Sequence, residues 1–219
     1  MSILATKTGA LAGAAIAISL LGTGYAVAQD TDGASAYEIV PLAEGLSHPW
    51  SLTFMPDGSI LIVEQPGSIR VMRDGTLADE PVSGVPEVYF ESQGGLFDVV
   101  LDPDFEENSL VYLSYAHGTP SSNATRVARA RFDGTALADL VVIFEATPAK
   151  DTPVHYGGRI VFLPDETMLV TIGDGFDYRE EAQNLGSHLG KIVRIGRDGN
   201  ALSDNPFIDR DGALPEIWS

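Results

Sequence analysis

Histidine is the residue type in this sequence best suited to proton transfer, and one of the four histidines stands apart by its surroundings. His155 lies within Pro-Val-His-Tyr-Gly-Gly-Arg, residues 153–159, directly before an apolar run. Imidazole titrates close enough to neutrality to take a proton from a substrate hydroxyl, and glycines allow close approach of backbone or ligand. His155 is therefore the candidate general base. The alternative is a loop histidine whose ring bonds a backbone carbonyl.

Two further polar residues occupy comparable places. Gln93 precedes two glycines at the start of the preceding apolar run, the position equivalent to His155 in that repeat. It could hold a substrate hydroxyl or a quinone-type oxygen, or it could be a turn amide that bonds its own backbone. Asp174, between Gly173 and Gly175 at the end of an apolar run, could orient a neighbour or bind a cation. The alternative for Asp174 is a simple Asx turn.

The other three histidines are expected to have structural or solvent-exposed roles. His48 precedes Pro49-Trp50 and is expected to have a packing role. His117 lies in a segment rich in Ser, Thr and Gly and is predicted to be solvated. His188 falls within a predicted helix, Arg179–Leu189, where a structural role is expected.

Composition excludes several classes of protein. The 219 residues contain no Cys, so disulfide scaffolds, zinc-thiolate sites, Fe–S clusters and thiol nucleophiles are excluded. The formal net charge of −18 argues against a nucleic-acid partner, because phosphate backbones are held by clustered Lys and Arg. The motifs G-x-S-x-G, H-E-x-x-H and the P-loop are absent, so a serine hydrolase, a zincin or an NTPase would lack its main part.

Residues 1–28 have the pattern of a cleavable signal peptide. Lys7 precedes an apolar stretch that ends in Ala26-Val-Ala28, an A-x-A cleavage site. Cleavage is therefore expected after Ala28, with residues 29–219 folding in the periplasm or outside the cell. The alternative is an uncleaved membrane anchor. No other stretch is long and apolar enough to span a membrane.

Short apolar runs divided by Gly, Pro and Asp predict antiparallel β-structure. Each of three units reads as a strand, a turn, a second strand, an excursion and an alternating strand that ends in Asp-Gly. The turns contain Pro56, Pro103 and Pro164, and the Asp-Gly pairs begin at residues 74, 133 and 198. Internal repeats of this kind indicate a repeat architecture.

Repeated units of about four short strands predict an all-β fold, a β-propeller of four-stranded antiparallel blades. Propellers close with about four to eight blades, and three are visible here. An additional strand is expected around Tyr37–Leu42, and the start of a further unit around Leu214–Trp218. Residues 29–219 are therefore expected to be a partial propeller, the front half of a longer protein. Ala116–Thr125 is predicted to be a surface loop.

The order and spacing of these phrases resemble the soluble PQQ-dependent aldose sugar dehydrogenases of the glucose/sorbosone dehydrogenase family. The resemblance extends over roughly Tyr37 to Ser219. The segments that carry it are Gly45–Ser51, Pro56–Gly58, Gln93–Phe105, Val111–Tyr115, His155–Arg159, Thr171–Asp174, Leu189–Ile195 and Asn205–Phe207.

This resemblance implies a six-bladed propeller, export, and PQQ bound with calcium at the mouth. It also implies that His155 takes the proton of the anomeric hydroxyl while a hydride moves to the quinone, giving a lactone. Gln93 matches a residue near substrate and quinone, and Asp174 an acidic residue that positions its neighbours. Arg159 is expected to be structural. Some members have an acid directly before the histidine, and this chain has Val154 there.

PQQ carries three carboxylates, and the resemblance implies that most of its cationic and calcium ligands lie beyond Ser219. The complete protein is therefore predicted to oxidise aldoses, with an unspecified electron acceptor, and this chain alone to be inactive. Two other functions remain open at this point. One is a calcium-dependent lactonase or hydrolase of propeller fold, and the other is a non-catalytic extracytoplasmic binding module.

Overall fold

The computed structural model describes residues 40–219. The predicted signal peptide, residues 1–28, and residues 37–39 of the expected first strand lie outside the described residues. By its internal contacts the chain divides into two units, Met1–Val40 and Pro41–Ser219. Within residues 40–219, no helix has the length and apolar character needed to cross a bilayer.

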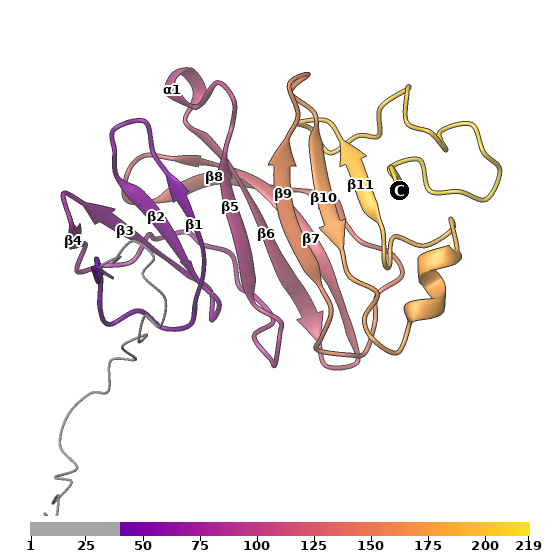
Figure 1. Cartoon of the computed structure of the whole chain (residues 1–219), viewed down its shortest axis with the longest axis horizontal. Helices are drawn as coiled ribbons and strands as arrows, with labels where there is room; N and C mark the ends of the chain where they lie inside the picture. Colours follow the sequence, from indigo (N-terminus) through magenta and orange to yellow (C-terminus); the bar gives the residue numbers. More distant parts are fainter. Residues whose placement is uncertain (1–39) are drawn as a thin grey trace, which may run out of the picture. The chain divides into compact units, whose positions relative to one another are not determined.

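Pro41–Ser219 contains three antiparallel sheets, each built from strands consecutive in the chain (Figure 1). The first sheet comprises β1 (Pro49–Phe54), β2 (Ile60–Glu64), β3 (Ser68–Arg73) and β4 (Thr76–Leu77). The second comprises β5 (Leu96–Leu101), β6 (Leu110–Thr119), β7 (Ser122–Phe132) and β8 (Leu137–Glu145). The third comprises β9 (Gly157–Phe162), β10 (Met168–Ile172) and β11 (Ile192–Ile195). Two short helices complete the set, α1 (Phe105–Asn108) and the 3₁₀ helix η1 (Arg179–Gln183).

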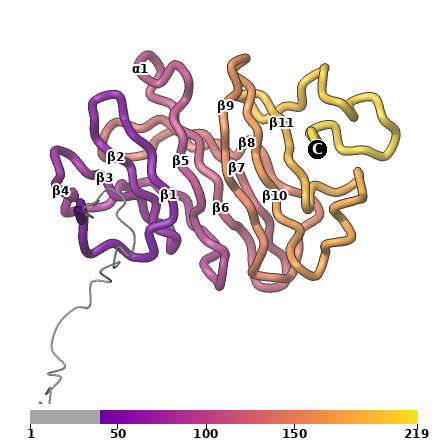
Figure 2. The backbone as a smooth tube through the Cα atoms, in the orientation of Figure 1, coloured from indigo at the N-terminus to yellow at the C-terminus, as the bar shows by residue number. Residues whose placement is uncertain are grey.

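The first strand of each sheet lies beside the first strand of the next. β1 contacts β5, and β5 contacts β9, so these three strands form the inner side of the assembly. The later strands of each sheet follow in sequence order, and the tube in Figure 2 shows this for β9, β10 and β11. This is the arrangement of propeller blades around an axis. The all-β fold with antiparallel blades is therefore confirmed, with three sheets in the described residues.

Two layers of buried apolar side chains hold the sheets together, one between the first and second sheets and one between the second and third. Because side chains alternate along a strand, neighbouring residues of β6 belong to different layers. In β6, Val111 and Leu113 face the first sheet, whereas Tyr112 between them faces the third. The first layer packs them against Leu61 and Val63 of β2. Because side chains alternate across a strand, one β-sheet can supply both layers. The central strand β6 is consequently buried on both faces over Val111–Ala116.

The predicted turn at Pro56–Gly58 is confirmed. The amide of Met55 donates to the carbonyl of Ser59 at 2.8 Å, and Gly58 adopts a φ of +84°, which glycine accepts without strain. The side chain of Asp57 accepts from the amide of Ser59 at 2.9 Å. The same sequence pattern at Pro103 instead leads into α1.

Four expectations about elements need correction. Ala116–Thr125 is not a loop, because β6 and β7 continue through it as a hairpin that turns at residues 120–121. The helix expected over Arg179–Leu189 is only η1, which ends at Gln183. No strand covers residues 40–42. Ile217 does not start a new unit, because it forms a bridge with Val193 and extends the third sheet beyond β11.

Candidate functional site

Three loops at the same end of the inner strands bring the predicted site residues together. Gln93 lies in the loop before β5, His155 in the loop before β9, and Asp174 directly after β10. The backbone amide of His155 donates to Oε1 of Gln93 at 2.8 Å. Nδ1 of His155 lies 2.7 Å from Oδ1 of Asp174. Residues separated by 62 and 19 positions in the sequence thus form one cluster.

The His155–Asp174 contact assigns the state of the imidazole. The pKa of the Asp174 carboxyl is lowered, first by the hydrogen bond from the backbone amide of Phe176 and then by the bond to His155. An ionised carboxylate can only accept, so the proton of the neutral ring belongs on Nδ1 and the lone pair on Nε2. No group within residues 40–219 bonds Nε2. The side chain of His155 is 42% exposed, so a solute can reach that lone pair.

Asp174 makes two contacts at once, one with its own backbone turn and one with His155. Its Oδ1 accepts from the amide of Phe176 at 2.8 Å, which is an Asx turn, and the same oxygen meets His155. Gln93 does not bond its own backbone through the side chain, because its carbonyl oxygen is engaged by the amide of His155. Its own backbone amide donates to the carbonyl of Pro153 at 3.0 Å. The loop before β5 therefore supports the loop before β9.

An aromatic side chain that sequence reasoning missed stands beside the imidazole. The ring of Phe176 packs edge-on to His155, with ring centroids 5.3 Å apart and an interplanar angle of 87°. The guanidinium of Arg179 covers Phe176 at 4.6 Å from the ring centroid. Phe176 follows Asp174 by two residues, but no pattern in the sequence indicated that its ring reaches the histidine. It gives the open side of the site an apolar wall.

The backbone around His155 is held in an uncommon conformation. His155 has a φ of +51°, in the left-handed region, which costs of the order of 1 kcal/mol or more for a residue with a side chain. The amide of Gly173 donates to the carbonyl of Tyr156 at 2.9 Å, and a Cβ at Gly173 would lie 2.0 Å from the carbonyl oxygen of His155. Only glycine fits at this approach of β10 to the histidine loop.

A buried carboxylate joins the second and third sheets beneath the site. Asp98 of β5 accepts from Nη1 of Arg159 at 2.9 Å and from the backbone amide of Ile160 at 3.1 Å. Its side chain is 3% exposed, and burial raises the pKa of Asp98 against the opposing effect of these donors. Arg159 thus has the structural contacts expected for it.

The sequence profile described as Glucose / Sorbosone dehydrogenase matches residues 46–219, across all three sheets and the whole cluster. The chain belongs to this family.

Relatives of this glucose/sorbosone dehydrogenase family member agree with the assignment. The chain is 38% identical over 182 residues to aldose sugar dehydrogenase YliI of Escherichia coli K12, a match that covers 81% of this chain and 49% of that protein. It is 47% identical over 197 residues to the uncharacterized protein slr1608 of Synechocystis, covering 82% and 48%. The chain therefore spans about half the length of the curated relatives it matches.

The fold agrees with a solved structure of the same kind. The structure of the PQQ-bound form of aldose sugar dehydrogenase from Streptomyces coelicolor matches with a TM-score of 0.68 and 28% identity. The match covers 80% of this chain and 51% of that chain.

The described residues of this family member fit one part of a quinone site but not all of it. His155 and Asp174 pair as an imidazole and a carboxylate, an arrangement that is chemically capable of proton transfer. Two cations lie near the cluster: Arg179, whose Nε donates to the carbonyl of Phe176, and Arg159, which pairs with Asp98. Across residues 40–219, no three His, Asp or Glu side chains gather as a metal site. These residues alone do not supply the cations that three carboxylates require.

The remaining histidines lie apart from the cluster. His188 is buried, and its Nδ1 accepts from the amide of Thr147 at 3.1 Å, so the expected structural role agrees with its contacts. The ring of His48 packs edge-on to Phe90 with centroids 6.0 Å apart, although the residue is exposed. His117 is half-buried on β6 beside Tyr115, with ring centroids 6.4 Å apart, and is less solvated than expected.

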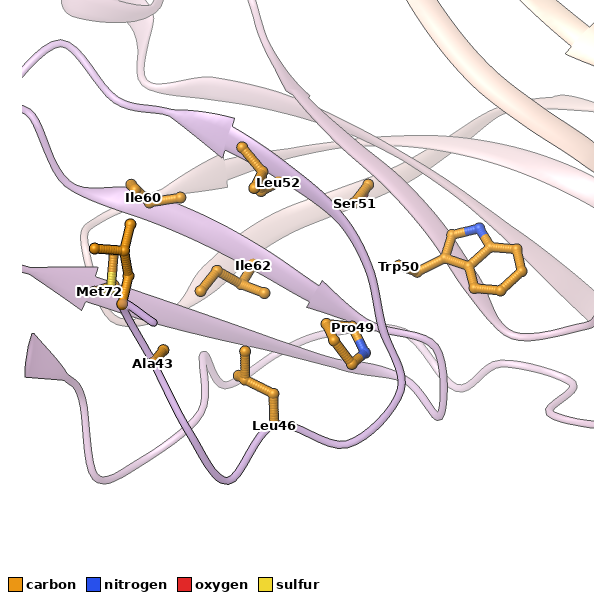
Figure 3. Close-up of a pocket in the computed structure, with 10 residues that line it drawn as sticks. Ala43, Leu46, Pro49, Trp50, Ser51, Leu52, Ile60, Ile62 and Met72 are labelled. Carbon is orange, nitrogen blue, oxygen red and sulfur yellow. The ribbon is translucent and has the colours of Figure 1, made fainter. Parts of the chain in front are cut away.

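An apolar pocket of about 410 Å³ lies on the first sheet, and none of the three predicted site residues lines it (Figure 3). Its walls include Leu46, Trp50, Leu52 and Ile62 from the segment before β1 and from β1 and β2. It carries no titratable side chain. The chemistry of the cluster therefore does not depend on this pocket.

Proposed function

We propose that the complete protein carrying these residues oxidises aldose sugars at the anomeric carbon, with PQQ as the hydride acceptor and His155 as the general base. The observation that carries the proposal is the 2.7 Å contact between Nδ1 of His155 and Asp174, which leaves Nε2 open to a solute. Support comes from the relatives, one named an aldose sugar dehydrogenase and one solved with PQQ bound.

The chain's own residues supply the proton-transfer half of this reaction. Nε2 of His155 accepts the proton of the anomeric hydroxyl as the C1–H bond breaks and the C1–O bond becomes a carbonyl, which makes the sugar a lactone. The imidazolium that forms carries two N–H donors, and its charge is stabilised by the carboxylate of Asp174. When bound, the quinone supplies the acceptor for the hydride that leaves C1.

Gln93 and Phe176 would orient the sugar. Since Oε1 of Gln93 accepts from the backbone of His155, its amide NH₂ is the group left to donate to a substrate or quinone oxygen. The ring of Phe176, about half exposed beside the imidazole, offers an apolar surface for the C–H face of a pyranose. Both contacts would hold C1 near Nε2, where proximity lowers the barrier.

The proposal extends to location and cofactors. We propose a periplasmic or secreted protein, on the signal-peptide pattern of residues 1–28, which lie outside the described part of the chain. Calcium is proposed as a second cofactor, on the family resemblance alone. Because the described residues lack a free cationic cluster, we expect the 219-residue chain by itself not to oxidise sugars.

The test is His155→Gln in the complete protein, with His117→Gln as the matched control. With PQQ, calcium and a dye acceptor, H155Q should lose about 10²- to 10⁴-fold in kcat, the usual contribution of a general base. It should still bind PQQ, followed by the quinone absorbance, and H117Q should keep wild-type turnover.

Wild-type turnover by H155Q would refute the role of the histidine. A complete wild-type protein that binds PQQ but reduces no dye with any aldose would instead indicate a binding module.

A further inference from the structure

Beneath the candidate site lies a buried lysine that the proposed reaction does not use. Lys150 is 3% exposed, and its ammonium sits 3.4 Å from the centroid of the Tyr156 ring. Nζ also donates to Oδ1 of Asn123 at 3.2 Å and to the backbone carbonyl of Thr152. No carboxylate among residues 40–219 bonds it. An amide oxygen, a carbonyl and an aromatic face are its partners in place of a counter-ion.

These partners connect Lys150 directly to the histidine loop. The hydroxyl of Tyr156 donates to the same oxygen of Asn123 at 2.7 Å, and Tyr156 is the residue after His155. The hydroxyl of Thr152 donates to the carbonyl of Gly175 at 2.7 Å, next to Asp174. Lys150 is therefore linked to His155 through Tyr156, and to the residue after Asp174 through Thr152.

We propose that Lys150 is a positioning residue: its buried ammonium ties residues 152–156 to Asn123 of β7 and so holds the imidazole of His155 against Asp174. This rests on the proposed role of His155 as the base. Without the ammonium, the carbonyl of Thr152 loses a donor and the ring of Tyr156 loses its cation, while the strained backbone at His155 remains. The loop should then relax toward less strained conformations.

The device is sensitive to pH. Burial lowers the pKa of Lys150 to about 8, and the charge of Asp151 acts in the opposite direction. The other titratable groups around it are Tyr156, Tyr178 beside Gly175, and Tyr89 near Tyr156. Burial raises the pKa of Tyr156, so this phenol stays protonated when the lysine loses its proton. Above about pH 8, the lysine becomes neutral and the loop should loosen.

The first experiment follows the wild-type chain, uniformly labelled with ¹³C and ¹⁵N, by NMR. The ¹³Cε signal of Lys150 should titrate near pH 8, and the carbonyl carbons of Thr152 and His155 should shift with the same midpoint. A Lys150 titration that leaves both carbonyl signals unchanged would overturn the proposal. This measurement needs neither substitution nor sugar oxidation, so it stands apart from the proposed function.

The second experiment compares Lys150→Met with Lys191→Met. Lys191 is the second buried lysine within residues 40–219, and it donates to the carbonyls of Glu181 and Leu189. At pH 7, K150M should increase amide hydrogen exchange at His155 and Gly175 about tenfold, while the amides of β6 keep wild-type rates. K191M should leave exchange at His155 unchanged. Wild-type exchange at His155 in K150M would refute a positioning role.

In the complete protein, K150M should reduce kcat about tenfold with little change in KM, since a displaced base affects the reaction more than binding. The decline of kcat above pH 8 in the wild type should be absent from K150M. If K150M increases amide exchange at His155 but neither the wild type nor K150M oxidises a sugar, the proposed sugar oxidation is rejected and the positioning role is retained. Normal kcat and an unchanged alkaline profile in K150M would reject the positioning role alone.

Discussion

Replacing Gly173 by Ala should displace His155 without touching any side chain of the site. An added Cβ would lie 2.0 Å from the carbonyl oxygen of His155 and 2.4 Å from its carbonyl carbon. Favourable carbon contacts begin at about 3.5 Å, so the backbone of His155 has to retreat by roughly 1 Å. Both contacts are to backbone, which cannot rotate away.

A displacement of about 1 Å in a catalytic group typically costs on the order of 10²-fold in rate. The complete protein with G173A should therefore show kcat reduced about 100-fold, measured with an aldose and a dye acceptor. Gly186→Ala is the matched control, because its Cβ would approach nothing closer than 3.2 Å. Its kcat should stay within about twofold of wild type.

The 219-residue chain offers a second readout for the same change. In G173A the amides of Gly175 and His155 should exchange faster, because the hydrogen bonds from Gly175 to the carbonyl of His155 and from His155 to Gln93 are broken. Wild-type kcat in G173A, together with unchanged exchange, would show that the close approach does not position the histidine. The reasoning from this contact would then be refuted.

Two further predictions concern stability. Asp98→Ala should lower the free energy of unfolding by about 2 kcal/mol in urea titrations, because it leaves the amide of Ile160 without its acceptor. Arg159→Ala should lower it by less than about 1 kcal/mol, since that side chain is 56% exposed. Equal losses in the two variants would contradict this account. The pKa values of Asp165, Asp174 and Asp198 are lowered in the fold, so their contribution to stability is present above the unfolded value near 4 and is lost as pH falls through the folded values. Thermal unfolding between pH 7 and 3 should show this decline in stability. Asp174→Asn should make the decline shallower, whereas Asp209→Asn, which removes an exposed carboxylate, should not. Identical slopes of stability against pH in the two variants would exclude Asp174 as a contributor.

The blade pattern could be predicted because it depends on local chemistry. Period-2 alternation and turn residues such as Pro56 and Gly58 determine strands and reversals within a few residues. The outermost strands β4 and β8 were not located, since their exposed faces carry no clear alternation. The segment Ala116–Thr125 was misassigned because its polar residues lie on a hairpin, where partner strands rather than composition decide the structure.

The sequence indicated which residues form the candidate cluster, but not which residues hold them in place. His155, Gln93 and Asp174 were identified from their glycine-rich contexts, and the structure brings them together. One bond between them uses the backbone amide of His155 and the other joins two side chains, and both connect residues far apart in the sequence, so their geometry could not be deduced from spacing. Lys150 and Phe176 were missed for the same reason, because a buried cation or a ring beside a base is defined by the neighbours that fold around it.

The cluster is divided between two sheets, and this has a consequence for how the protein tolerates change. Gln93 lies in the loop that leads into the second sheet, whereas His155 and Asp174 lie in loops of the third. Asp98 bonds Arg159 and so joins the two sheets. Lengthening a hairpin at the outer rim, such as Asp133–Thr135, would leave this junction untouched. Removing one residue from 149–153 would instead shift the register between two neighbouring blades. Natural and engineered insertions should therefore accumulate at the periphery, while the chain length across the junction stays fixed.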